Sequence, residues 1–322
     1  MTRFLIQRLV ETALVLALMS FVVYGLIGLM PGDPIDLMIA SDPSLTPDDA
    51  ARLRAIYGLD RPLVERYLAW LGGALQGDFG YSRLTSRPVL DMLLPRLGNT
   101  LLLMGLSFAL AVAIAIPAGT IAAMRPHGVV DGTINLMAFA GISVPPFWLA
   151  ILLIILFAVT LGVLPAGGTG SAGGDLSGLA WLADRVRHLV LPVATLTLIS
   201  AGALIRYTRA AVGEALRQDF IRTAYAKGSS TTRVVIHHAL RSAMIPIVTI
   251  MALDFGTLFS GALITETMFA YLGMGKTIYD AVMGNDYNLA LVGLLFATAV
   301  VLASNLLADL CYAWLDPRID YR

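Results

Sequence analysis

The sequence predicts an all-α, polytopic membrane protein with six transmembrane helices. Of its 322 residues, 57% are hydrophobic and only 14% are charged, and the mean hydropathy is +0.78. An ordinary soluble protein carries roughly 25% charged residues, so this composition indicates the bilayer. The apolar residues gather in six stretches, each close to the roughly 20 residues that a helix needs to cross a ~30 Å hydrocarbon core. A transmembrane β-barrel would show alternating segments of about 10 residues instead.

The predicted spans cover residues 9–30, 100–124, 133–164, 189–205, 243–265 and 289–315. Lipid leaves no water to satisfy an open backbone, so each span must be a helix. The first span resembles a signal peptide, but its apolar run is too long for one. It ends in Met30-Pro31-Gly32-Asp33-Pro34 rather than in a small-x-small cleavage site, so we expect a retained anchor.

These spans divide the chain into four predicted segments. Residues 1–30 form an N-terminal transmembrane helix, and residues 31–98 form an outer, periplasmic cap. Residues 99–315 form a five-helix core that contains an inner loop at 206–241. Residues 316–322 form a tail.

Basic residues in the short loops predict the orientation of the spans, because they are enriched on the cytoplasmic side. The inner loop holds seven of them, whereas the short outer loops hold only Arg185, Arg187 and Lys276. The seven are Arg206, Arg209, Arg217, Arg222, Lys227, Arg233 and Arg241. We therefore expect both termini to be cytoplasmic.

Several classes of function are excluded or disfavoured. The 22 basic and 22 acidic residues balance, which excludes a basic nucleic-acid-binding protein. The single cysteine, Cys311, excludes an intrachain disulfide and a cysteine-based zinc site. His237 and His238 point about 100° apart on a helix and cannot share a metal ion. Gly275-Lys276-Thr277 resembles the end of a phosphate-binding loop, but Ala270 stands where that motif needs glycine. We expect this chain to bind no metal and no cofactor.

The outer segment carries signals for short helices. Thr46-Pro47-Asp48-Asp49 predicts a helix start, with a capping hydroxyl, an early proline and acidic residues at the positive end of the helix dipole. A second short helix is predicted over 62–71, with three side chains able to lie at the membrane surface: Tyr67, Trp70 and Leu71. The segment is a structured cap, a docking surface for an external partner, or both. Further on, the stretch 167–174 has the Gly- and Ser-rich composition of a flexible linker.

The inner loop 206–241 is longer than a simple connection needs. It predicts two helical pieces separated at Gly228-Ser229-Ser230, the second covering 231–242. The first piece carries apolar residues at helical spacing, namely Val212, Leu216, Phe220 and Tyr225. One interpretation is an amphipathic helix on an anionic lipid surface. The other is a docking element for a cytoplasmic protein.

Polar residues within spans are rare and tend to be functional. Asp254, near the middle of the fifth span, either hydrogen-bonds a neighbouring helix or lines a solute path. Pro145-Pro146 break the third span, and broken helices at membrane depth occur where they line a cavity or pack on neighbours. As a hypothesis, the translocation pathway includes Asp254, Ser143 and Pro145. Asn135, Asn305 and Asp309 are interpreted as contacts between helices.

Short motifs are spread over nearly the whole chain. In order they are Met30-Pro31-Gly32-Asp33-Pro34, Tyr57-Gly58-Leu59-Asp60-Arg61-Pro62, Gly77-Asp78-Phe79-Gly80-Tyr81-Ser82, Arg96-Leu97-Gly98-Asn99-Thr100, Ile142-Ser143-Val144-Pro145-Pro146-Phe147-Trp148, the run from Asp219 to Gly228, His238-Ala239-Leu240-Arg241, Glu266-Thr267-Met268-Phe269, Gly273-Met274-Gly275 and Asp316-Pro317-Arg318. Together they resemble the peptide-type permease subunits of bacterial ABC importers, the group for dipeptides, oligopeptides, nickel and glutathione.

The resemblance implies an ABC importer type I permease fold and a non-catalytic subunit that forms half of a translocation pathway in the bacterial inner (plasma) membrane. Its partners would be a second homologous permease, two ATPase subunits that bind ATP and Mg²⁺, a periplasmic solute-binding protein and membrane lipids. The inner loop would be the coupling loop that docks on the ATPases, switching the pathway between inward-open and outward-open states. The residues implied in docking are Arg222, Thr223, Ala224, Ala226, Lys227, Gly228 and Arg233.

Two other classes of function are weighed against this one. An ion-coupled secondary transporter would show charged residues along an ion path and inverted repeats. A membrane-embedded enzyme would need a catalytic cluster near the interface, and none stands out in the sequence. The sequence leaves the solute open among di- and oligopeptides, nickel, glutathione and other small solutes.

Overall fold

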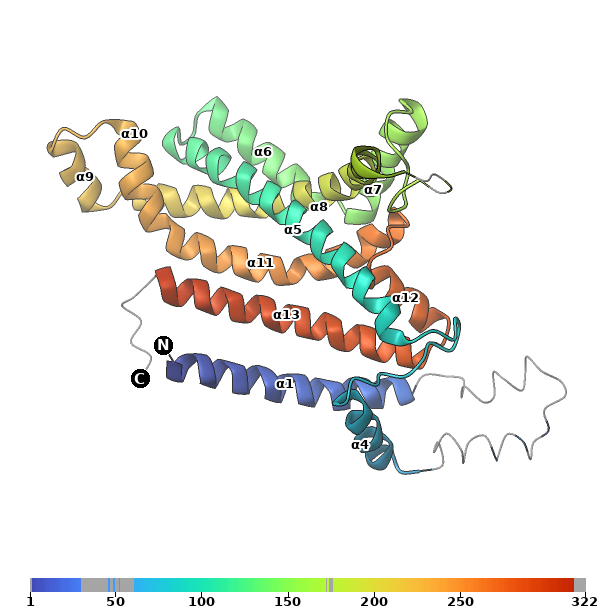
Figure 1. The fold of residues 1–322 in the computed structure, drawn as a ribbon. Coiled ribbons are helices and arrows are strands. Elements are labelled where there is room, and N and C mark those ends of the chain that lie inside the picture. The colour runs from blue at the N-terminus through green and yellow to red at the C-terminus, as the bar shows by residue number, and fades with distance from the viewer. Residues whose placement is uncertain are drawn as a thin grey trace. The chain divides into compact units, whose positions relative to one another are not determined.

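The structure is a computed structural model that describes residues 2–29, 46, 49, 52, 61–171, 173 and 176–315. Its elements are helices, and within these described residues there is no strand, only an isolated bridge between Tyr81 and Pro88 (Figure 1). The prediction of an all-α protein is confirmed. The predicted features at 30–34, at 57–60 and in the tail 316–322 lie outside the described residues.

Five helices are long and apolar enough to cross a membrane, and a bent pair adds a sixth span. Four of these spans lie within α1 (Thr2–Gly28), α5 (Val89–Met124), α8 (Gly178–Ala215) and α13 (Tyr287–Leu315). The other runs from Thr231 into α11 (Arg241–Met268) and ends at Gly256. The pair joins α6 (Val129–Ser143) to α7 (Pro146–Leu153) and its continuation, the π-helix η1 (Ile154–Thr160), with a bend of 102°. Six spans were predicted, and the described residues supply five, or six if the bent pair counts as one span.

Two of the helices are much longer than predicted. Helix α5 begins at Val89 rather than near Thr100, and α8 has 38 residues around the predicted span 189–205. At 1.5 Å per residue α8 is about 57 Å long, well beyond the ~30 Å hydrocarbon core. The predicted ends were placed at charged residues, which end an apolar stretch but do not end a helix.

The bend between α6 and α7 has its cause in two consecutive prolines. A residue before proline is pushed out of the α conformation, and proline itself offers no N–H to the helix ladder. Val144 is extended (φ −85°, ψ 124°), and so is Pro145 (φ −61°, ψ 140°). Pro146 then occupies the first turn of α7, where a missing N–H has no cost. The single prolines inside α8 and α11, Pro192 and Pro246, leave their helices continuous.

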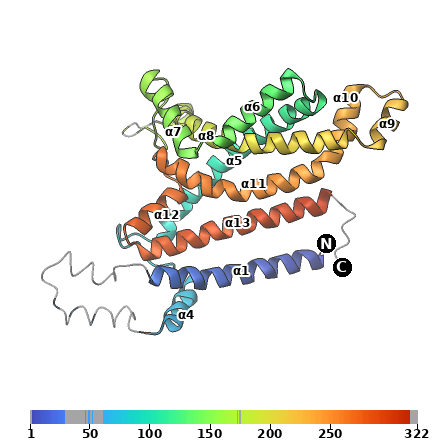
Figure 2. The same ribbon diagram turned by 180° about the vertical axis from the view of Figure 1, so that it is seen from behind.

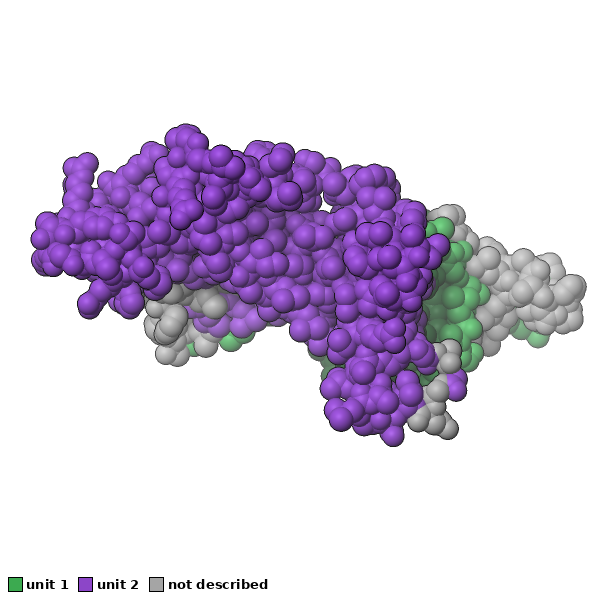
Figure 3. All heavy atoms as spheres, turned by 90° about the horizontal axis from the view of Figure 1, so that it is seen from above, with its two compact units in different colours: residues 1–97, 277–299 green, residues 98–276, 300–322 purple. Residues whose placement is uncertain are grey.

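The chain divides into two compact units (Figure 3). Unit 1 comprises residues 1–97 and 277–299, and unit 2 comprises residues 98–276 and 300–322. The predicted segments 1–30, 31–98, 99–315 and 316–322 follow membrane topology, which this division does not test.

In unit 1, α4 (Leu63–Ala74) corresponds to the second short helix predicted in the outer segment. Its Tyr67 is buried against α1, where the Tyr67 and Ser20 hydroxyls share a hydrogen bond of 2.7 Å. The rings of Phe21 and Tyr24 pack at 5.1 and 5.6 Å from the Tyr67 ring. The prediction that Tyr67 lies at the membrane surface is therefore wrong, because α1 offers it an aromatic pocket.

The other predicted helix start in this segment shows the expected capping contacts. Asp49 accepts hydrogen bonds from the Thr46 hydroxyl at 2.6 Å and from the Thr46 backbone N–H at 3.0 Å. The Asp49 N–H in turn donates to the Thr46 hydroxyl at 3.2 Å. This reciprocal pair is a capping box, and it lowers the pKa of the Asp49 carboxyl.

A buried aspartate anchors the end of the outer segment within unit 1. Asp286, at the start of α13, accepts hydrogen bonds from the Ser82 hydroxyl at 2.5 Å and the Leu84 N–H at 3.2 Å. Arg83 donates to the Gly284 and Asn285 carbonyls at the end of α12 (Met274–Met283). Satisfying these exposed helix-end groups fixes the segment 81–88 to the turn between α12 and α13.

Unit 2 is built around α8, against which α6 and α11 both pack. Glycines permit the close approach of α6. A Cβ on Gly202 would lie 2.5 Å from the Ala138 carbonyl oxygen, and a Cβ on Gly141 would lie 2.7 Å from the Leu198 carbonyl oxygen. Small residues at such crossings are typical of membrane helices, because close backbone packing replaces the hydrophobic effect between them.

The Gly- and Ser-rich stretch is not a flexible linker where the structure describes it. The Gly168 N–H donates to the Phe269 carbonyl at 2.8 Å. The Ser171 N–H and hydroxyl both donate to the Asp184 carboxylate, at 2.7 and 2.6 Å. Gly167 leaves no room for a Cβ beside the Phe269 carbonyl. Glycine here allows close backbone approach, which composition alone does not distinguish from flexibility.

Candidate functional site

The inner loop folds into the two predicted helical pieces, α9 (Asp219–Ala226) and α10 (Thr231–Arg233), the second continuing into the π-helix η2 (Val234–Leu240). Figures 1 and 2 show α9 and α10 beyond the ends of α8 and α11, at one extremity of unit 2. The loop therefore projects from the helices that could cross a membrane.

Gly228 makes the turn between the two pieces. Its φ is +79°, a left-handed conformation that costs other residues about 1–2 kcal/mol. The Gly228 N–H donates to the Tyr225 carbonyl at 2.9 Å, and the Ser229 N–H donates to the Ala224 carbonyl at 3.2 Å. These two bonds form a Schellman motif, which satisfies the last carbonyls of α9. The predicted requirement for glycine at this bend is confirmed.

One face of α9 is buried within the loop itself. Ile221 and Ala224 are only 3% and 6% exposed. They share a hydrophobic cluster with Val212 of α8 and with Val234 and Ala239 of η2. Helix α9, the end of α8 and η2 therefore form one packed body. Ala224 was predicted as a docking residue, but its side chain packs inward and has little surface to offer a partner.

The opposite face of α9 is open. The Arg222 side chain is 83% exposed and pairs only loosely with Asp219, at 3.6 Å. An exposed ion pair of this kind contributes about 0–1 kcal/mol, so it does not hold the loop together. The remaining predicted docking residues are also exposed, namely Thr223, Ala226, Lys227, Gly228 and Arg233.

Two aromatic residues of this face were missed as docking candidates. Phe220 and Tyr225 are 41% and 45% exposed, although the apolar spacing placed them on one stripe with Val212 and Leu216. Helix α8 ends at Ala215, and the break before Asp219 resets the helical phase. The signal that could have found them is Asp219 itself, because an acidic residue often begins a new helix.

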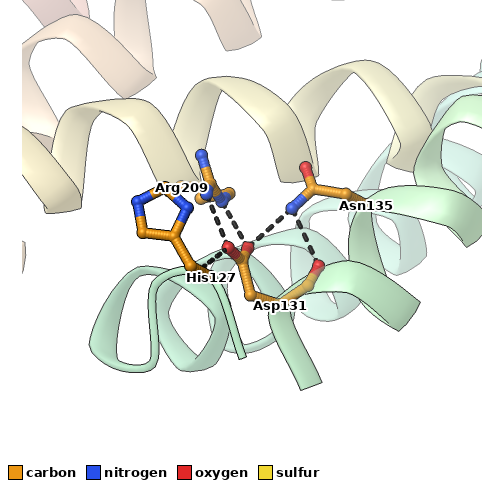
Figure 4. Close-up of polar contacts among 4 residues, drawn as sticks. All are labelled: His127, Asp131, Asn135 and Arg209. Atoms are coloured by element: carbon orange, nitrogen blue, oxygen red, sulfur yellow. Dashed lines mark hydrogen bonds and ion pairs between the residues drawn. The ribbon is translucent and has the colours of Figure 1, made fainter. Parts of the chain in front are cut away.

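A second polar cluster lies on α6 and α8 (Figure 4). The Arg209 guanidinium donates through Nε to Asp131 Oδ1 at 2.5 Å and through Nη2 to Oδ2 at 2.6 Å. Asp131 also accepts the His127 N–H at 2.9 Å and the Asn135 side-chain amide at 2.6 Å. Asp131 is 3% exposed, whereas the Arg209 side chain is 32% exposed, so this two-point pair is buried on the aspartate side only. Asn135 was predicted as a contact between helices, and its amide instead bonds within α6.

Asp254 lies half-buried on α11, and the Ser200 side chain of α8 hydrogen-bonds to it. The hydrogen bond to a neighbouring helix, one of the two interpretations of Asp254, is therefore present. Ser143 and Pro145 have exposed side chains at the bend between α6 and α7, and α7 packs against α11. The structure thus places the three predicted pathway residues on elements that pack together within unit 2.

A third cluster surrounds Glu266 at the end of α11. Its carboxylate is fully buried and accepts hydrogen bonds from the Thr100 hydroxyl at 2.5 Å and the Lys276 N–H at 3.0 Å. The Thr100 hydroxyl also accepts the Met274 N–H at 2.8 Å. A Cβ on Gly273 would overlap the Glu266 carboxylate. The backbone N–H of Lys276, which a phosphate loop would present to a nucleotide, is thus bound by an internal carboxylate.

The loop after Glu266 is anchored by a buried tyrosine. The Tyr271 hydroxyl donates to the Asn99 carbonyl at 3.3 Å, and the Asn99 side-chain amide donates to the Leu272 carbonyl at 2.8 Å. Burial raises the pKa of Tyr271 to about 12, so the hydroxyl remains a donor at neutral pH. Among the described residues, no group of three or more His, Cys, Asp or Glu side chains is arranged to hold a metal ion.

Comparison with known families covers almost the whole chain. Residues 115–321 match the family described as the binding-protein-dependent transport system inner membrane component. Residues 1–104 match the N-terminal region of the same kind of membrane component.

Named relatives match along their full length. The oligopeptide transport system permease protein AppB of Bacillus subtilis is 36% identical over 322 residues, covering 100% of both chains. A putative peptide permease of Brucella suis is 38% identical over 99% of both chains. The dipeptide transport system permease protein DppB of Escherichia coli is 34% identical over 100% of both chains.

Solved structures share the fold at low sequence identity. A membrane chain of the inward-facing MetNI methionine ABC transporter gives a TM-score of 0.57 at 17% identity, covering 70% of this chain and 97% of its own. An amino acid ABC transporter gives 0.51 at 14% identity, covering 70% and 94%. At these identities the comparison shows the fold alone.

Proposed function

The chain belongs to the family of binding-protein-dependent transport system inner membrane components, and on that premise we propose that it is the permease subunit of a bacterial ATP-driven importer of di- or oligopeptides. The observation that carries the proposal is the full-length match to relatives named as peptide permeases. The membrane-spanning helices and the projecting α9 loop are what such a subunit needs.

In this proposal the subunit changes conformation and catalyses no reaction itself. Two partner ATPases bind and hydrolyse ATP with Mg²⁺, a second permease completes the pathway, and a periplasmic binding protein delivers the solute. The ATPases dock on the exposed face of α9, where Phe220, Arg222 and Tyr225 are accessible. In this proposal the α9 loop and both termini lie in the cytoplasm. The excess of basic residues in 206–241 supports that orientation.

Transport follows from an equilibrium between the inward-open and outward-open states. The ATPases and the binding protein each shift this equilibrium. Closure of the ATPases displaces α9, and the packed body of α9, η2 and the end of α8 carries the displacement into the spanning helices. A ligand shifts such an equilibrium only by its difference in affinity for the two states. The ATP-bound ATPases and the loaded binding protein therefore each favour one opening of the pathway.

The pathway itself includes Asp254, with Ser143 and Pro145 at the nearby bend. We expect Asp254→Asn to lower peptide transport at least tenfold, equivalent to about 1.4 kcal/mol, while the complex assembles normally. The reason is that an acidic side chain lining the translocation pathway interacts with the solute, and asparagine removes its charge. The measurement is uptake per assembled complex in proteoliposomes. Asp309→Asn on α13 is the matched control, and wild-type uptake by Asp254→Asn would remove this residue from the pathway.

The function is tested by reconstituting the chain with its second permease, ATPases and binding protein. Labelled dialanine and tetra-alanine are the primary probes, and glutathione and a nickel complex test the alternative solutes. We expect uptake of a peptide that requires ATP and is abolished without the ATPase subunits. Uptake that persists without them under an ion gradient would instead establish a secondary transporter, for which Asp254 is the favouring observation.

A further inference from the structure

The Asp131–Arg209 ion pair sits where the α9 body meets the rest of unit 2. Arg209 lies on α8 six residues before its last residue, Ala215, which is buried in the same cluster as Ile221 and Ala224 of α9. Arg209 is therefore attached through one continuous helix to the body that carries the α9 docking face. A displacement of α9 carries Arg209 with it.

Asp131 is attached in the other direction to the bend in the broken span. It lies in the first turn of α6, which continues without interruption to Ser143 and ends at the extended pair Val144 and Pro145. Because the two prolines remove the helix ladder there, the bend is the place where α6 and α7 can change angle. A movement of α6 therefore acts on the bend.

The ion pair lies beyond the apolar part of the contact between α6 and α8. In that part Ala138 of α6 shares a hydrophobic cluster with Ala201, Leu204 and Ile205 of α8, and Gly202 and Gly141 lie against the Ala138 and Leu198 carbonyls. Ala138 follows Asp131 by about two helical turns, and Gly202 precedes Arg209 by the same interval, so the ion pair lies about 10 Å from the Gly202 contact along an antiparallel pair. Apolar packing is non-directional, so the ion pair adds a directional contact at the first turn of α6.

The chemistry of the pair suits this task. Arginine and aspartate meet through two parallel hydrogen bonds, which fix orientation as well as distance. The remaining acceptor sites of Asp131 are occupied by the His127 N–H, from the turn just before α6, and by the Asn135 amide of α6. The carboxylate is thus held rigidly on α6 before the guanidinium of α8 reaches it (Figure 4).

We propose that Asp131 and Arg209 are positioning residues that make α6 and α8 move as one body, so that displacement of α9 reaches the bend at Pro145. This inference rests on the proposed function, because it takes α9 as the point where the ATPases act. Without the pair, the ATPases still dock and hydrolyse ATP, but the first turn of α6 no longer follows α8 and less of the motion reaches the bend.

The test separates coupling from folding. Replacing Arg209 alone leaves the buried Asp131 carboxylate without its counterpart and destabilises the protein for that reason alone. The decisive variant is therefore the double substitution Asp131→Leu with Arg209→Leu, since apolar replacement of a buried pair often preserves the fold. Arg209→Lys keeps the charge but loses the two-point geometry. Thr133→Val, an exposed position of α6, is the matched control.

The readouts are ATPase co-purification, ATP hydrolysis and uptake of labelled tetra-alanine by the complete complex in proteoliposomes. We expect the double variant to keep wild-type co-purification and hydrolysis but to import at least fivefold fewer peptides per ATP, with Arg209→Lys intermediate and Thr133→Val unchanged. A double variant with the wild-type ratio of peptide to ATP would overturn the inference. Absence of ATP-driven uptake by the unsubstituted complex would overturn the proposed function instead.

Discussion

Replacing Gly228 by proline is expected to abolish ATPase docking and peptide transport while leaving membrane insertion intact. Proline fixes φ near −65° and has no N–H, whereas Gly228 has φ +79° and donates to the Tyr225 carbonyl. The turn after α9 therefore cannot close, and α9 loses its place against η2. The spanning helices do not contain this turn, so they insert as before. The measurement is the amount of ATPase that co-purifies with membrane-inserted permease.

A graded series makes this prediction sharper. Asparagine tolerates the left-handed conformation better than other non-glycine residues, so Gly228→Asn is expected to retain most docking and Gly228→Ala less. A bulky residue at Ala224 is expected to act like the proline, because it forces α9 away from Val234 and Ala239. If Gly228→Pro and Ala224→Phe co-purified the ATPases in normal amounts, the assignment of the docking loop would be wrong.

Replacing Glu266 by alanine is expected to give the largest loss of stability. The substitution removes the acceptor of the Thr100 hydroxyl and of the Lys276 N–H in a fully buried site. Leaving buried donors without an acceptor costs about 1–3 kcal/mol each, so the expected total for the two donors is about 2–6 kcal/mol. The substitution therefore loosens the contact that Glu266 of α11 makes with Thr100 of α5 and with the start of α12. The measurement is the apparent Tm of the purified complex in detergent.

Matched variants separate the contacts of this cluster. Glu65→Ala removes an exposed carboxylate of α4 and is expected to leave the Tm unchanged. Thr100→Val should also lower the Tm, because it removes one hydrogen bond to the carboxylate and the acceptor of the Met274 N–H. Gly273→Ala should destabilise as well, since its Cβ would overlap the Glu266 carboxylate. An unchanged Tm for Glu266→Ala would contradict the structural importance of this cluster.

The local features of the chain were predictable because they depend on neighbours in sequence. Long apolar stretches identified the spans, two adjacent prolines identified the break between α6 and α7, and Gly228 identified the turn after α9. The α9 loop was also located, and its exposed basic residues followed from the same reasoning. In each case a few consecutive residues determine the backbone conformation.

The faces of the helices were not predictable in the same way. In a membrane, residues that face lipid and residues that face other helices are both apolar, so periodicity does not tell one from the other. The short helices outside the spans were not predictable either, because their faces depend on where each helix begins and on what packs against it. The apolar spacing put Phe220 and Tyr225 on one stripe with Val212 and Leu216, whereas the fold buries Ile221 and Ala224 and exposes the two aromatics. Tyr67 was predicted to be able to lie at the membrane surface, and it is buried on α1.

Taken by itself, the sequence determined the class of protein, the number of spans and the position of the α9 loop, since these follow from composition and local backbone preference. Packing decided which distant residues meet: Asp131 with Arg209, Glu266 with Thr100, and Ser171 with Asp184. Those pairings depend on how closely helices approach at glycines such as Gly202. The closeness of such an approach is a property of two helices together, and no single stretch of the sequence records it.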